Sequence, residues 1–471
     1  MKLKLLALAL LFGLGHMAAA DLNSAKELYA KKDYNAAIPA LQELLAKTPQ
    51  NAQLNEMLAV SLYKTGQAET AKKYFEAAQK KGNAEAMLYL SEYKYNDYDF
   101  EGCEELLNSY AAALKKVGKE VGSEGNKAIA KMSRAKDMIN HVEKIIVFDS
   151  LNVAKKDFFK AYKISPESGS LKDASILPSN YQGKCTSPVY CSSDKNYMLW
   201  ASKDSDRITR IMESDKLLDG SWDAPAQEDD VLNNDGDADY PFLMPDGQTL
   251  YYASNGSSSI GGYDIFVSRK DEDSGSFLTP QNVGMPFNSP FNDYLLVIDE
   301  QAGIGWWASD RNQIADSVTI YMFQPNQVRV NYSPDTTNIK ELASLTDIKL
   351  TWPENADFSD LKNKIKTMPT EQEAKKHDFE FHVSKGVVYT TLDDAKTKEG
   401  RNLLEQYFST VKVQDGNIKK MNALRAQFHS AKKADRQSLS STILQLEKNL
   451  QKRQEEIDYL ANSIRRAEGY K

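Results

Sequence analysis

One short stretch of the chain gathers enough carboxylates to suggest metal chemistry. Aspartates recur at alternate positions there, and calcium prefers several carboxylate oxygens close together. The candidate ligands are Asp235, Asp237 and Asp239. A calcium loop that begins in this way requires glycine where this chain has Tyr240, so the alternative is that these aspartates start turns and strands. Calcium is therefore the weaker interpretation, and the sequence predicts no cofactor.

Other catalytic patterns are missing. An α/β-type serine hydrolase needs a Gly-x-Ser-x-Gly elbow, and the glycine- and serine-rich residues 256–261 instead indicate a loop between strands. No Gly-x-x-x-x-Gly-Lys-Ser/Thr phosphate loop occurs. We therefore predict no catalytic residues and no enzyme, with a hydrolase that uses an unrecognised site as an alternative.

Length and composition limit the remaining classes. The 471 residues are enough for about three modules. A formal net charge of −7 argues against a nucleic-acid partner. Three cysteines and five histidines exclude a multi-cysteine zinc scaffold.

The first twenty residues are typical of an export signal. Lys2 and Lys4 precede an apolar run over residues 5–14, which is too short to cross a bilayer. Small residues then lead to Ala20. We predict cleavage after Ala20 and export, with an uncleaved anchor as the alternative. No later segment is predicted to span a membrane.

Export changes the interpretation of the cysteines. Cys185 and Cys191 are close in sequence, in a chain expected to reach a compartment that permits disulfides. The sequence leaves a bridge between them and two independent thiols equally open. Cys103 lies at a helix-packing position and is predicted to be a small buried residue.

Residues 21–117 show helical periodicity and an internal repeat. Residues 33–38 match residues 67–72, and residues 99–104 match them again less closely. A 34-residue period with small residues at helix contacts is the tetratricopeptide pattern, with a plain array of helical hairpins as the alternative. About three stacked pairs leave a concave face that usually holds a peptide or helix. Residues 118–144 are predicted to form a helical connector.

Residues 145–410 change to short strands at a long period. One four-residue motif begins at Trp200, at Tyr252 and again at Trp307, at nearly equal intervals. A repeat of about 40–55 residues with three or four strands is the period of a β-propeller blade. The residues assigned to the blade motif are Trp200, Ser202, Asp246, Gly247, Tyr252, Ser254, Asp264, Trp307, Ser309 and Asp310.

Three blades cannot close a ring, so further blades are predicted on both sides. The candidates are residues 145–178, 328–353 and 379–392, which bring the expected number to about six. A small β-sandwich or an open piece of three blades is the alternative. Two motif positions, Asn234 and Asp239, are predicted to correspond to Asn288 and Asp293 of the next repeat.

These blade motifs resemble PD40 repeats, the WD40-like blades of TolB-type propellers. The resemblance rests on residues 239–254, 261–266 and 307–311. Together with the export signal and the helical repeat, it is similar to periplasmic proteins common in Bacteroidota, one branch of which anchors the type IX secretion apparatus. Many members add an OmpA-like peptidoglycan-binding domain. No such domain follows here, so the resemblance does not extend to peptidoglycan anchoring.

Residues 411–471 are predicted to be helical, with apolar residues at heptad spacing. Such a seam either pairs with a second copy of itself or folds back on the helix around Met421 as an antiparallel hairpin. A single solvated helix is the third alternative, and Arg453 inside the seam argues against a simple zipper. The seam residues are Leu439, Ile443, Leu446, Leu450, Ile457, Leu460 and Ile464.

These modules together predict a fold that combines an α-solenoid, an all-β propeller and a C-terminal coiled coil. The expected function is an exported, non-enzymatic scaffold that binds other envelope proteins. The resemblance implies a periplasmic or outer-membrane-associated place in a secretion-associated assembly. A propeller that senses glycans or peptidoglycan is the other alternative.

Overall fold

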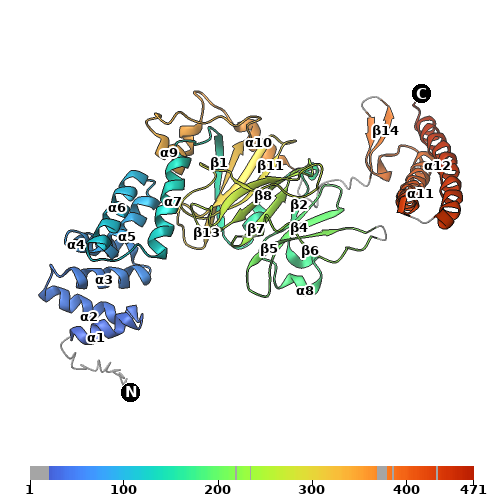
Figure 1. The fold of residues 1–471 in the computed structure, drawn as a ribbon. Coiled ribbons are helices and arrows are strands. Elements are labelled where there is room, and N and C mark those ends of the chain that lie inside the picture. Colours follow the sequence, from blue (N-terminus) through green and yellow to red (C-terminus); the bar gives the residue numbers. More distant parts are fainter. Residues whose placement is uncertain are drawn as a thin grey trace, which may run out of the picture.

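The computed structural model describes residues 21–470 apart from 218–219, 234, 369–378, 385–386 and 431–432. The predicted export signal and its cleavage point after Ala20 lie outside the described residues. Within them, no helix is both long and apolar enough to cross a membrane. Helices, then sheets, then a long helical hairpin follow one another along the chain (Figure 1).

Stacked pairs of helices form the first part, which we call the helical array. Side chains of Asp33, Asn51, Asn83 and Asp99 accept a hydrogen bond from the first turn of the helix that each precedes, so short polar residues set where those helices begin. The repeat positions Ala37, Ala71 and Cys103 are buried, as predicted. The helices are α1 (Leu22–Ala30), α2 (Tyr34–Lys47), α3 (Ala52–Lys64), α4 (Ala68–Gln79), α5 (Ala84–Asn96), α6 (Phe100–Lys116) and α7 (Ser123–Ile139).

Three antiparallel sheets form the second part, which we call the sheet region. The first sheet has the order β2 (Ser170–Lys172), β3 (Val189–Cys191), β4 (Tyr197–Lys203), β5 (Thr209–Asp215) and β6 (Ala226–Gln227). The second has the order β7 (Ala238–Leu243), β8 (Thr249–Ser254), β9 (Asp264–Arg269) and β10 (Gln281–Asn282). The third has the order β11 (Asp293–Asp299), β12 (Ile304–Ser309), β13 (Ser317–Gln324) and β1 (Ile146–Ala154).

The repeated motif occupies equivalent places in these sheets. Trp200, Tyr252 and Trp307 lie in β4, β8 and β12, the second strands of the repeat, and all three side chains are buried. Neighbouring sheets pack together, with β7 against β4 and β11 against β8. Before the second of these strands, Asp246 accepts hydrogen bonds from the backbone N–H groups of Gln248 and Thr249, which forms the predicted turn.

The predicted blade at residues 145–178 is not a separate sheet. Its strand β1 pairs with β13 and completes the third sheet, with Leu151 opposite Ile320. The edge of β13 would otherwise leave its backbone donors and acceptors unpaired. A segment from the start of the sheet region and one from its end are therefore tied together by backbone hydrogen bonds.

The two predicted downstream blades are also wrong. Residues 328–353 contain α9 (Ile339–Ser344) and a 3₁₀ turn, and among their described positions only Asn331 forms a lone β-bridge. Residues 379–392 contain β14 (Phe381–Ser384) and β15 (Val387–Tyr389), which pack on the C-terminal helices. Short runs of aromatic and β-branched residues were interpreted as blade strands. Such runs also occur in small elements that pack against helices. Large sheets end at Gln324, not near residue 410.

Small elements cover the sheets. Residues of α10 (Ser359–Thr367) and the preceding loop join the main core, where Phe358 lies 5.9 Å from the ring of Phe148. The remaining short elements are α8 (Ser179–Gln182) and the 3₁₀ turns Phe158–Ala161, Pro166–Ser168, Ala174–Ile176, Ile348–Thr351 and Leu392–Asp394.

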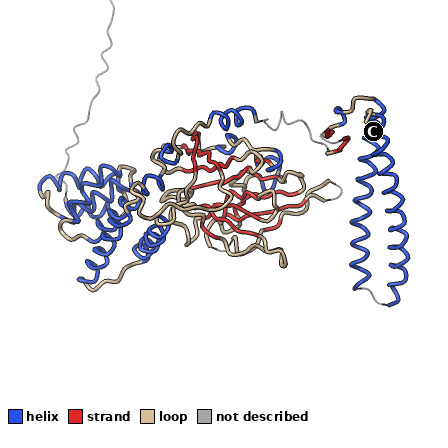
Figure 2. Tube along the Cα trace, turned by 90° about the horizontal axis from the view of Figure 1, so that it is seen from above, coloured by secondary structure: helices blue, strands red, loops and turns tan. Residues whose placement is uncertain are grey.

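The C-terminal part is an antiparallel hairpin of α11 (Lys398–Ser430) and α12 (Lys433–Ala467), seen side by side in Figure 2. The hairpin alternative is the one that the structure shows. Gln414 donates a hydrogen bond to the carbonyl of Leu450 at 3.1 Å, and Arg425 pairs with Glu447 at 2.6 Å. The seam residues that are buried within the hairpin are Ile443, Leu450, Ile457, Leu460 and Ile464, while Leu439 and Leu446 are half-buried.

Candidate functional site

The helical array meets the sheet region along several segments, and the loop of residues 259–261 is the one that receives its hydrogen bonds. Its three successive carbonyls accept hydrogen bonds from the array: Tyr95 donates to Ile260 at 2.6 Å, Lys131 to Gly261, and Arg134 to Ser259 at 3.5 Å. Burial lowers the pKa of Lys131. A side chain at Gly261 would collide with the carbonyl of Phe291, so the close approach of the loop to Phe291 needs glycine. The array is thereby held against the sheets.

Asp264, a predicted blade-motif residue, holds this loop from its other side. Its carboxylate accepts hydrogen bonds from the backbone N–H groups of Ile260 and Gly261, both at 2.9 Å, and from Asn282 at 2.7 Å. Burial raises the pKa of Asp264 to about 7. The aspartate therefore positions the contact between the two parts of the molecule.

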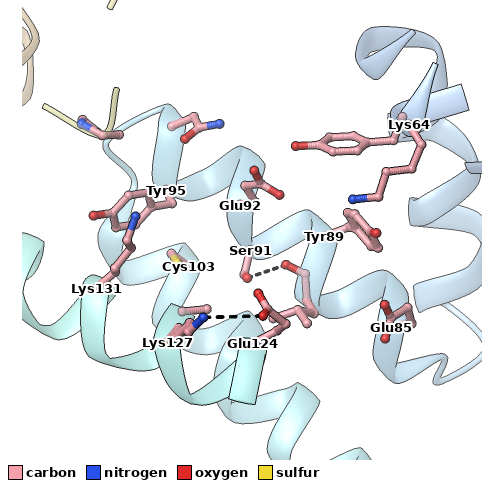
Figure 3. A pocket seen from close by; sticks show the side chains of 15 residues that line it. Lys64, Glu85, Tyr89, Ser91, Glu92, Tyr95, Cys103, Glu124, Lys127 and Lys131 are labelled. Carbon is pink, nitrogen blue, oxygen red and sulfur yellow. Dashed lines mark hydrogen bonds and ion pairs between the residues drawn. The ribbon is translucent and has the colours of Figure 1, made fainter. Parts of the chain in front are cut away.

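A groove of about 570 Å³ lies beside this contact, on the face formed by α3, α5 and α7 (Figure 3). Pro290 from the sheet region also lines it. The other lining residues are Tyr63, Lys64, Glu85, Leu88, Tyr89, Ser91, Glu92, Tyr95, Asn96, Cys103, Glu124, Lys127, Ala128 and Lys131.

Tyrosines form one wall of the groove. The rings of Tyr63 and Tyr89 lie 5.2 Å apart in an edge-on arrangement, and Phe75 stacks on Tyr89 from within the core at 4.7 Å. The Lys64 ammonium lies 5.7 Å from the centre of the Tyr89 ring. Half-buried phenols of this kind combine an apolar face with a polar tip, which suits a protein-binding surface.

The sequence prediction did not name this groove, although a signal for it exists. Glu85, Tyr89 and Glu92 stand at positions i, i+4 and i+7 of α5 and so share one helix face. Tyr63 and Lys64 end the neighbouring helix α3. Where two helices pack tightly, small apolar residues are expected between them. Aromatic and charged residues at those positions instead indicate a solvent-accessible groove.

The tyrosine wall of the groove falls in a segment that matches a known family. Residues 28–89 match the tetratricopeptide repeat family. The match runs from the end of α1 into α5, so it includes Tyr63 and Tyr89, and it confirms the predicted repeat over that range. No curated protein and no solved structure matches the chain. Within the tetratricopeptide repeats, a face lined by alternate helices is where an extended partner is expected.

The calcium candidates do not form a metal site. Asp235 accepts hydrogen bonds from Ser257, and Asp239 accepts one from Thr186 at 3.1 Å. Asp237 accepts one from the backbone N–H of Thr209 at 2.7 Å. Across the described residues, no group of three or more His, Cys, Asp or Glu side chains could hold a metal. The alternate spacing sends each carboxylate to a different neighbour, which is the arrangement expected of turn and strand residues.

Asp237 belongs to a contact that recurs between sheets. It pairs with Asn255 at 3.0 Å, and in the next repeat Asn292 pairs with Asp310 at 2.8 Å. Asp237 also accepts a hydrogen bond from the backbone N–H of Thr209 in β5. Asn292 likewise accepts one from the backbone N–H of Tyr263, just before β9, so both side chains contact the preceding sheet. The acid and the amide have exchanged places between the repeats. The fourth motif residue, such as Asp310, therefore holds in place the side chain that joins neighbouring sheets.

Of the two alternatives left open for Cys185 and Cys191, the structure shows the independent thiols, and both are free. Cys185 lies opposite Ser202 and Cys191 opposite Met198 on the same strand, β4. Those two points on one strand are separated by about 13 Å, beyond the reach of a disulfide. The Cys185 thiol instead donates to the carbonyl of Ser187 at 3.1 Å.

A buried carboxyl pair lies between the first and second sheets. The Tyr197 hydroxyl is 2.7 Å from a Glu213 oxygen and 2.8 Å from a Glu228 oxygen. One hydroxyl proton can be donated to only one of the two carboxylates, and the two negative charges repel each other. Burial and then the Glu213 charge raise the pKa of Glu228 to about 7, against the opposing charge of Lys270 at 3.8 Å.

This pair predicts a pH dependence of stability. Between pH 4.5 and about 7 the unfolded chain releases the Glu228 proton while the folded chain keeps it, so the free energy of unfolding falls across that window and then levels off. Glu228→Gln should remove most of this fall and leave the variant more stable than the parent at about pH 8. Urea unfolding at pH values on both sides of the window measures it. Equal pH dependence in parent and variant would contradict the assignment.

Proposed function

We propose that this protein is a non-enzymatic scaffold that binds other proteins, with the groove of its tetratricopeptide repeats as the principal docking site. The groove carries the proposal: it is open, lined by half-buried tyrosines, and placed on the face of the array where stacked helix pairs take extended segments. The loop at residues 259–261 supports it, because a docking surface held against a second module has a defined orientation.

We propose further that the three sheets act as PD40-like blades and present a second surface. The equivalent placement of Trp200, Tyr252 and Trp307 supports this, as does the packing of each sheet on the next. The pairing of β1 with β13 supports it too, because a sheet built from both ends of a module ties those ends together. Open ends of the stack are covered by short helices and loops.

The proposed setting is the cell envelope. It rests on the export signal predicted over residues 1–20 and on the resemblance to periplasmic repeat proteins. The partner would then be another envelope protein, in an outer-membrane or secretion-associated assembly of the type IX kind.

Site-specific photocrosslinking in intact cells tests the scaffold. A benzophenone amino acid at Lys64, in the groove, should give a defined adduct with one protein, because the side chain reaches the surface that the partner covers. The same group at Lys80, an exposed position at the end of α4 that does not line the groove, is the matched control and should give none. The proposal fails if neither position gives an adduct and the purified protein turns over a substrate.

A further inference from the structure

Beside the tyrosine wall, the groove carries more negative than positive charge, with Glu85 and Glu92 against Lys64. Glu85 and Glu92 line the groove and their charges act on the phenol of Tyr89, as does the charge of Glu56, which lies outside the lining. None of them forms an ion pair with lysine or arginine in the part of the chain that the structure describes. Burial, followed by the charges of Glu85 and Glu92, raises the pKa of Tyr89 to about 12. Burial and the charge of Glu85 also raise the pKa of Glu56, although Tyr29 donates a hydrogen bond to it at 3.0 Å.

The positive side chains of the groove are mostly engaged elsewhere. Lys131 donates to the carbonyl of Gly261, and Lys127 lies 3.8 Å from Glu124 (Figure 3). Lys64 remains, and its ammonium lies 5.8 Å and 5.7 Å from the centres of the Tyr63 and Tyr89 rings. Two carboxylates, those of Glu85 and Glu92, therefore stand against one ammonium along the tyrosine wall.

The position of Lys64 shows what the wall accepts. A cation over an aromatic face is attracted by the ring, and the attraction grows when carboxylates stand beside it. Lys64 reaches that place on a flexible side chain from the end of α3, so a cation from a partner could replace it there without moving the backbone.

We propose that the groove takes an extended segment of a partner protein with a lysine or arginine side chain, whose cation lies over Tyr89 between Glu85 and Glu92. This inference rests on the proposed function and adds the chemistry of the partner. A negatively charged segment would meet the carboxylates of Glu85 and Glu92 and lose the attraction of the ring face.

The test uses the full chain and a positional-scanning library of nine-residue peptides. One position at a time is fixed as Lys, Arg, Glu, Asp or Gln, and the others are randomised. We expect retention of peptides fixed as Lys or Arg, with binding that weakens at about 300 mM salt because the attraction is screened. Enrichment of Glu or Asp, or no charge preference, would overturn the inference and leave the docking groove intact. Failure to retain any peptide, together with no crosslink at Lys64, would overturn both.

Variants then locate the charge. E85Q together with E92Q should weaken the selected basic peptide by about tenfold. Lys64→Gln should strengthen its binding, since a competing ammonium is gone; a structural role for Lys64 would not give that sign. E76Q is the matched control, because Glu76 is exposed on α4 and does not line the groove, and it should leave affinity unchanged. Equal affinity in the double variant and E76Q would contradict the proposal.

Discussion

Arg311→Met is expected to lower the free energy of unfolding of the sheet region by about 3–5 kcal/mol. Arg311 pairs with Asp293 at 2.8 Å, and the two side chains are only 2% and 0% exposed. The guanidinium also donates to the carbonyl of Phe287 at 2.7 Å and to the Ser309 hydroxyl at 2.9 Å. Methionine fills similar space but leaves the Asp293 carboxylate buried without its cation.

The effect is large because the buried Asp293 carboxylate loses its positively charged partner. Two donors to Asp293 survive the change, the backbone N–H and the hydroxyl of Ser289 at 2.7 Å and 2.8 Å, but they do not replace a full positive charge. Burial already raises the pKa of Asp293 against the opposing effect of Arg311. Removal of Arg311 should raise it further, so the variant should lose more stability at pH 8 than at pH 5.

Urea unfolding followed by tryptophan fluorescence measures this loss, because Trp306 and Trp307 lie in the same sheet. The matched control is Arg401→Met. Arg401 pairs with Asp393 at the same distance, 2.8 Å, but the two side chains are 53% and 82% exposed. That change should cost less than about 1 kcal/mol. Similar losses in the two variants would show that burial of the pair does not control its contribution.

The repeats were visible in the sequence because their spacing is set by local geometry. A helix pair needs about 34 residues, and small residues must recur where its helices cross, so the tetratricopeptide pattern could be read directly. The tetrad at Trp200, Tyr252 and Trp307 was likewise predictable, because a buried strand followed by a turn leaves a strong local pattern.

Pairings between distant segments were not predictable in the same way. Nothing in residues 146–154 says that their partner is β13, because an edge strand pairs through its backbone. The heptads of α12 could equally have packed against α12 of a second copy of the chain. The hairpin forms because α11 precedes α12 in the same chain and packs against it. The groove was missed because its wall arises where alternate helices come together in space.

One predicted correspondence was wrong by a single position, and the error is informative. The sequence aligned Asn234 with Asn288, whereas the structure gives that role to Asn233, the residue just before it. Asp239 likewise aligns with Tyr294 and not with Asp293, because Asp239 faces Ala253 and Tyr294 faces Ala308. Identical residue types one place apart misled the alignment, and hydrogen bonding shows the true register.

Asn288→Ala should therefore lower the free energy of unfolding by about 2 kcal/mol. The Asn288 amide accepts from the backbone N–H of Ile265 at 2.7 Å and donates to the carbonyl of the same residue at 2.8 Å. The side chain is fully buried, so alanine leaves the backbone N–H of Ile265 without a partner and without water, while the Ile265 carbonyl keeps the hydrogen bond from the backbone N–H of Val283 at 3.1 Å. Asn233 makes the same two hydrogen bonds to Ile211, at 2.9 Å and 3.4 Å.

The equivalent asparagines Asn288 and Asn233 make the test specific to the repeat. Asn233→Ala should also destabilise the sheets, and by less, because its second hydrogen bond is longer. In the third sheet, Ile320 is equivalent to Ile211 and Ile265. It pairs with strand β1, so backbone groups there take the place of the asparagine side chain. Asn449→Ala, at an exposed position of α12, is the control and should not destabilise the protein. If Asn288→Ala matched that control in urea unfolding, the amides would not be what joins one sheet to the next.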